Sequence, residues 1–182
     1  MKTKFLTAVL AIVGLFGVVT VANAQTTGSV TLNIKLNPIQ TLVVNSKQTT
    51  VNLDYKTKSD YANGVSVDQA DHLTVYSTGG FQVKVKAAGS QLTGKANNID
   101  ASDVILTASN GTSALSNSAS FSSAHLSAQD QVIVSSTKGG VDKTINVNYA
   151  AKGDNNKYLD YYQNTENPTV FTTTLTYTIV AQ

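Results

Sequence analysis

Hydrophobic and polar residues alternate along most of this chain, which is the pattern of β-strands with one buried face. The clearest case lies near the end, where Phe171, Leu175, Tyr177 and Ile179 share one face and threonines occupy the other. Further strands are predicted over residues 28–36, 39–44, 51–55, 73–76, 81–85, 103–108, 132–134 and 145–149.

Two of the predicted strand pairs flank similar turns, Ser-Thr-Gly-Gly at 77–80 and Ser-Thr-Lys-Gly-Gly at 136–140. Each is expected to be a β-hairpin, because Gly-Gly between two strands is typical of hairpin turns. The shared turn is either a weak internal repeat or two independent uses of common turn residues. Residues 109–123 and 152–168 are expected to be loops, with a short helical turn near 58–63 or 126–130. Many short strands with polar turns predict an all-β fold, a sandwich rather than a barrel.

The first 24 residues have the three parts of a secretory signal peptide. Lys2 and Lys4 precede an apolar stretch that ends in the small-residue site Ala22-Asn23-Ala24. A membrane anchor is the alternative interpretation, but the flanking residues fit cleavage better. We therefore expect export across the inner membrane, with residues 25–182 forming a single domain.

Composition excludes several function classes. All 13 basic residues are Lys, and two of them lie in the predicted signal, which leaves 11 Lys against 11 acidic residues. A balanced charge without arginine gives no basis for nucleic-acid binding. The chain has no cysteine, so neither disulfides nor a thiol nucleophile are available.

The search for catalytic groups gives no convincing set, and we predict neither an enzyme nor a cofactor. His72 and His125 are both expected on the surface, and adjacent Asp71 points away from His72 if the two share a strand. Carboxylate pairs for glycoside hydrolysis would have to come from turns, where Asp is common for other reasons. The candidates are Asp68 with Asp71 and Asp100 with Asp103.

The polar stretch near residue 160 leaves two questions open. Asp154, Asn156, Tyr158 and Asp160 alternate like oxygen ligands for calcium, but they depart from the EF-hand pattern, and we predict no metal. Tyr158, Tyr161 and Tyr162 form either a recognition face for a sugar or a partner, or a cap on one end of the sandwich.

The stretch behind the predicted signal is the most informative one. Val30, Leu32, Ile34 and Leu36 alternate with polar residues directly after the polar start of the mature chain. Such a strand either pairs within its own sheet or completes the sheet of a neighbouring copy by strand addition. The second arrangement does not close on itself and would build a filament.

Three features together resemble the chaperone–usher pilins, especially the cysteine-free, alpha-fimbria-like major subunits. They are the stretch Gly28–Ile39, the absence of cysteine and the closing strand Thr172–Ile179. The resemblance implies an immunoglobulin-like sandwich that lacks one strand, with a periplasmic chaperone and an outer-membrane usher as partners. It also implies that residues 28–36, within a candidate donor strand at 25–37, polymerise the protein. Residues 171–180 would then form the strand beside the groove.

Two functions therefore remain in view. The first is a structural subunit of a surface fibre that supports adhesion, located at the cell surface. The second is a secreted or periplasmic module that binds peptidoglycan or another glycan of the cell wall, since the closing strand also resembles that of small wall-binding domains.

Overall fold

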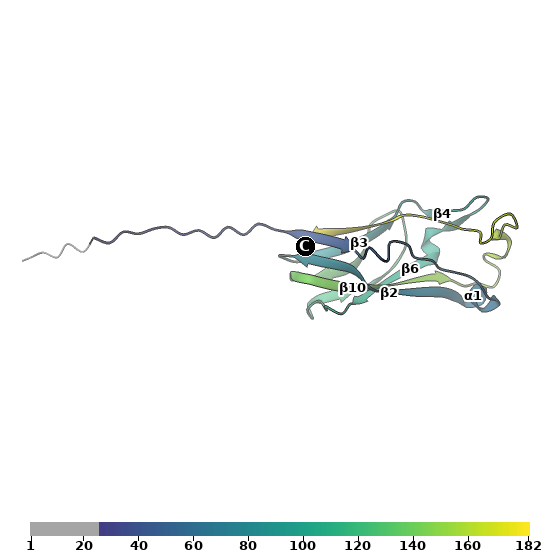
Figure 1. Cartoon of the computed structure of the whole chain (residues 1–182), viewed down its shortest axis with the longest axis horizontal. Coiled ribbons are helices and arrows are strands. Elements are labelled where there is room, and N and C mark those ends of the chain that lie inside the picture. Colours follow the sequence, from purple (N-terminus) through teal and green to yellow (C-terminus); the bar gives the residue numbers. More distant parts are fainter. Residues whose placement is uncertain (1–25) are drawn as a thin grey trace, which may run out of the picture. The chain divides into compact units, whose positions relative to one another are not determined.

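The structure, a computed structural model, describes residues 26–182 and confirms that the fold is all-β (Figure 1). The predicted signal peptide lies outside the described residues. No helix within residues 26–182 has the length and apolar character of a membrane span. The longer elements are β1 (Gln40–Val44), α1 (Lys58–Asn63), β2 (Gly64–Ser77), β3 (Phe81–Ala87), β6 (Val104–Asn110), β9 (Gln131–Ser136), β10 (Gly140–Lys152) and β11 (Leu175–Ala181). The shorter ones are β4 (Gln91–Thr93), β5 (Asn98–Asp100), η1 (Ala101–Asp103), β7 (Ala119–Phe121), β8 (Ser123–His125) and η2 (Leu159–Tyr161).

The strands form two antiparallel sheets and one small hairpin. The first sheet has the order β1-β2-β10-β6-β8, and the second has the order β11-β3-β9-β7. The hairpin pairs β4 with β5 and was not predicted. The predicted helical turn at 58–63 is present as α1, where Thr57 accepts a hydrogen bond from the Asp60 amide and Asp60 accepts one from the Thr57 amide.

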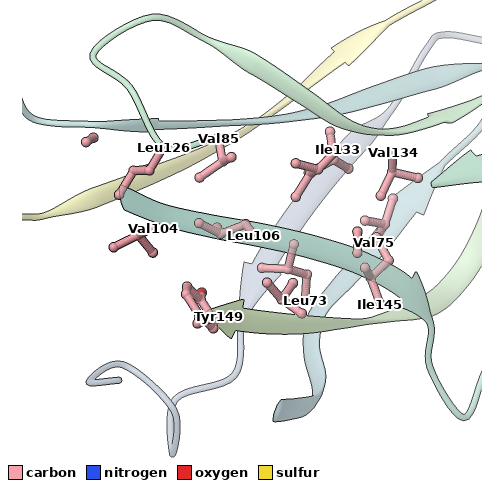
Figure 2. Close-up of a cluster of buried hydrophobic side chains, with 14 of the residues drawn as sticks. Leu73, Val75, Val85, Val104, Leu106, Leu126, Ile133, Val134, Ile145 and Tyr149 are labelled. Atoms are coloured by element: carbon pink, nitrogen blue, oxygen red, sulfur yellow. The ribbon is translucent and has the colours of Figure 1, made fainter. Parts of the chain in front are cut away.

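A single core lies between the two sheets, and Figure 2 shows side chains from both converging on it. The first sheet contributes Leu73, Leu106 and Ile145, and the second contributes Phe81 and Ile133, all fully buried. Each buried position alternates with an outward one along most of these strands, as the sequence pattern predicts. With no disulfide available, this apolar contact and the strand pairing hold the body together.

The two predicted hairpins are wrong, because each Gly-Gly turn carries the chain from one sheet to the other. β2 pairs with β1 and β10, whereas β3 pairs with β11 and β9, so the turn between β2 and β3 is an arch. The turn between β9 and β10 is a second arch. In both, a buried serine hydroxyl donates to a carbonyl two residues later, from Ser77 to Gly79 and from Ser136 to Lys138.

The glycines of these arches allow close backbone packing between them. A Cβ on Gly139 would overlap the carbonyl oxygen of Ser77 in the other arch. A Cβ on Gly80 would lie 3.1 Å from the carbonyl oxygen of Ser136. The similar turns thus pack against each other at one end of the body, which we call the arch end.

The opposite end of the body carries α1 and the long stretch 153–170, and we call it the loop end (Figure 1). β10 runs the whole way between the two ends, from Gly140 beside Ser77 to Lys152 beside Gly64. Its 13 residues correspond to a length of about 40 Å.

The two lateral edges of the sheets differ. On one side the chain passes from β7 at the edge of the second sheet directly into β8 at the edge of the first, which links the two edges. On the other side the edge strands are β1 and β11, which come from opposite parts of the chain.

Two predicted strands are not strands in the structure. Residues 26–39 and 51–56 belong to no helix or strand, although Val51, Leu53 and Tyr55 still alternate inward with exposed Asn52 and Asp54. The reason is that a strand exists only when its backbone has a partner. Both stretches have the side-chain pattern of a strand without the partner.

Candidate functional site

A cleft of about 810 Å³ lies in the body beside the edge formed by β1 and β11. One wall is residues 51–56, which follow β1, and the other is residues 167–171, which precede β11. Between them the lining includes Leu92, Ile99, Val104 and Ala151, from β4, β5, β6 and β10. The floor of the cleft between the walls is therefore apolar, whereas the walls also carry polar side chains such as Asn52, Asp54 and Asn167.

Most of the backbone of both walls is unpaired, although at the end of the first wall the Lys56 amide donates to the Asp60 carboxylate at 2.8 Å. Residues 51–55 and 167–171 make no backbone–backbone hydrogen bond with any residue that the structure describes. Just beyond the second wall, Thr172 pairs with Thr93, and β11 then pairs with β3 on one side only. Two facing stretches with free N–H and C=O groups are a template for an added strand.

Aromatic side chains fill the loop end of the cleft. Rings pack edge-to-face or tilted in one continuous series that runs through Tyr61, Tyr55, Tyr158, Tyr161 and Phe171, with centroids 5.3–5.9 Å apart. Burial and the nearby charge of Asp103 raise the pKa of Tyr55 to about 12, so its hydroxyl stays neutral. That hydroxyl donates a hydrogen bond of 2.5 Å to the carbonyl of Lys152.

A charge cluster around the buried Asp103 fixes this aromatic end. Asp103 accepts hydrogen bonds from Lys157 Nζ at 2.7 Å, Lys152 Nζ at 3.3 Å and the Tyr158 hydroxyl at 2.9 Å. Burial pushes the pKa of Asp103 upward, but these three donors outweigh it and hold the pKa below its usual value. The ionised carboxylate thus ties the stretch 153–162 to η1, directly before β6.

A hydrogen-bonded network lies toward the arch end, next to the edge strands. His72 Nε2 is 2.7 Å from the Tyr149 hydroxyl, which also contacts the Tyr177 hydroxyl of β11. His72 Nδ1 is 2.9 Å from the Gln48 amide oxygen and therefore carries the proton. Burial lowers the pKa of His72 and keeps the ring neutral. β1 and β11 approach each other to within 8 Å between Cα atoms beside this network, so the space between the two walls narrows there.

The expectation of a surface position is wrong for His72, which is only 2 % exposed. The inward–outward alternation of side chains along β2 is interrupted at Asp71, which directly precedes His72 and has a left-handed φ of 49°. Asp71 itself turns outward, and its carboxylate accepts from Thr112. His125 is exposed, as expected.

The residues of the candidate donor strand lie fully open to solvent. Val30, Leu32, Ile34 and Leu36 are 94, 86, 82 and 90 % exposed. Four consecutive apolar positions at strand spacing, all in solvent, are unusual for a soluble chain because such side chains are normally covered.

The closing-strand residues divide into two groups. Phe171 lies outside β11 and lines the cleft, whereas Leu175, Tyr177 and Ile179 lie in β11 and are half-buried against the core. Among the predicted recognition tyrosines, Tyr158 is buried while Tyr161 and Tyr162 line the cleft. The structure thus brings the tyrosines together with Phe171, which the sequence placed in a separate set.

The remaining acidic candidates have structural partners. Asp68 accepts from Asn148 and Asp100 accepts from Gln91, while Asp103 holds the charge cluster at the aromatic end. Within residues 26–182 no three acidic or histidine side chains gather closely enough to hold a metal ion. Comparison with protein-family models and with curated proteins finds no match for this chain.

Proposed function

We propose that this protein is a structural subunit of a bacterial surface fibre, and that its copies join by strand addition. In this proposal the body is an immunoglobulin-like sandwich that lacks one strand, and the missing strand is residues 28–36 of another copy. The observation that carries the proposal is the cleft with an apolar floor, in which residues 51–55 and 167–171 of the two walls have unpaired backbone.

The dimensions of the two parts agree. Residues 30–36 span about 20 Å as a strand, and the first wall, residues 51–56, spans a comparable length of about 17 Å when extended. Burial of the four apolar side chains contributes roughly 1.5–3 kcal/mol each, before the cost of ordering the segment is subtracted. Backbone hydrogen bonds to both walls add to this stabilisation. The contact between a donor strand and the cleft of the next copy, called the joint below, is therefore expected to be long-lived.

Export and partners belong to the same proposal. A signal peptide at residues 1–24 would deliver the chain to the periplasm, where an open apolar cleft is an aggregation hazard. A chaperone that supplies a temporary strand, followed by an outer-membrane usher, is the assembly route that the pilin resemblance implies.

The proposal is tested by expressing the full chain in its native secretion system and examining surface material by electron microscopy and by gel electrophoresis without heating. We expect filaments and a ladder of high-mass species. Deletion of residues 25–37 should abolish both and leave secreted monomer. A wild-type protein that remains monomeric under these conditions, with its chaperone and usher present, contradicts the proposal.

A glycan-binding module is the second candidate, and the observation in its favour is Tyr162, half-exposed at the cleft with a polar hydroxyl tip. This alternative predicts that the monomer is retained on purified cell wall, and that Tyr162→Ala abolishes retention. Fibre formation by the same variant would separate the two functions.

A further inference from the structure

Large apolar side chains are exposed at both ends of the two-sheet body. At the arch end, Ile39 and Val141 are 51 and 64 % exposed. Ile39 exchanges backbone hydrogen bonds with Thr78, and Val141 follows Gly140, which pairs with Ser77. These two side chains, which flank the first arch, are called the arch patch.

At the loop end, Leu159, Tyr162 and Val170 are each at least half exposed. Tyr162 and Val170 also line the cleft, and Leu159 is the first residue of η2, which ends directly before Tyr162. These three side chains are called the mouth patch. β10 separates the two patches by about 40 Å, so no single copy can bring them together.

In the proposed strand addition, the incoming strand can lie in the cleft in only one direction. Toward the arch end the Cα atoms of β1 and β11 lie within 8 Å of each other, and the Tyr177 hydroxyl contacts Tyr149, which contacts His72. These groups leave no room for a strand to pass, so the cleft is taken to be closed at this end. An incoming strand must place its free end there. Because the donating strand is attached to its own body at its C-terminal side, Leu36 must lie at the open loop end, next to the mouth patch.

The connection between the donor strand and its own body is short. Only residues 37–39, which include Pro38, separate Leu36 from the first residue of β1. The four Cα-to-Cα steps from Leu36 to Gln40 reach about 14 Å at full extension, and Pro38 restricts the path of the chain further. The arch end of the donating copy is therefore held directly against the loop end of the accepting copy.

We infer that consecutive copies dock through a second contact, in which the arch patch of the donating copy packs on the mouth patch of the accepting copy. This inference rests on the proposed strand addition, which brings the two patches together. The contact removes apolar side chains from water on both sides and fixes the angle between subunits. The fibre is then a straight rod with a regular repeat, instead of a series of bodies joined by flexible linkers.

The test compares fibres from the wild type with fibres from Val141→Lys and Leu159→Glu, each made in the full chain. Strand addition is intact in both variants, so ladders should persist. The persistence length measured by electron microscopy should fall at least about twofold, because the joint becomes a short flexible linker. Val132→Lys, at an exposed position on the outer side of β9, is the matched control and should leave the fibres straight.

Two further variants keep the inference falsifiable if a substitution disturbs folding. The double variant Val141→Lys with Leu159→Glu places opposite charges at the contact and should restore straightness. Insertion of Gly-Ser-Gly-Ser after Asn37 should loosen the joint without touching either patch. Straight, regular fibres from both single variants and from the insertion would overturn the docking contact and indicate another occupant for these patches, while strand addition would stand. Absence of any wild-type fibre would instead refute the proposed function.

Discussion

Replacing one inward residue of the donor strand with aspartate is the sharpest test of strand addition. Ile34 is 82 % exposed in the single chain, so Ile34→Asp removes no packing from the monomer. In a joined pair the same position enters the cleft, where the substitution forfeits about 2 kcal/mol of apolar burial. Placing a carboxylate among the apolar and aromatic lining costs at least about 2 kcal/mol more.

The total of about 4 kcal/mol corresponds to a roughly 1,000-fold weaker joint. The fraction of secreted protein in unheated gel ladders should therefore collapse, whereas circular dichroism of the monomer should not change. Asn33→Asp is the matched control, because it adds the same charge to the neighbouring outward position and should alter the joint by no more than about 0.5 kcal/mol. Equal loss of ladders in both variants, or normal ladders from Ile34→Asp, would refute the reasoning. A destabilised monomer would show that the segment packs within its own sheet.

Two further predictions concern the body itself. Burial lowers the pKa of His72 in the folded protein below its value near 6.5 in the unfolded chain. As the pH falls, the unfolded chain therefore binds a proton at His72 before the folded protein does. The melting temperature should be constant above about pH 6.5 and fall toward pH 5. His72→Gln should flatten this dependence on pH. An identical decline in the wild type and the variant would contradict the prediction. Gly139→Ala should destabilise the body by about 1–3 kcal/mol, since its Cβ would meet the other arch, and lower the melting temperature by roughly 3–10 °C. Gly79→Ala, with no atom within 4 Å of the new Cβ, is the control, and equal effects of the two would contradict the arch packing.

The sequence alone determined which side chains point inward along single strands. The alternation at 171–177 and at 51–55 is preserved in the structure, even where no strand forms, because the pattern depends only on local backbone extension. The all-β class follows from the same information repeated along the chain. The apolar residues at 30–36 could likewise be identified as a strand pattern from their spacing, but their exposure could not.

Only the tertiary structure decided which strands are partners. The sequences Ser-Thr-Gly-Gly and Ser-Thr-Lys-Gly-Gly suit a hairpin and an arch equally well, and long-range pairing of β2 with β10 and of β3 with β9 selects the arch. The burial of His72 and Asp103 depends on side chains from Gln48 and Lys157, which are distant in sequence. The cleft could not be predicted for the same reason: its walls lie more than 100 residues apart, and an unpaired edge is a property of two sheets together.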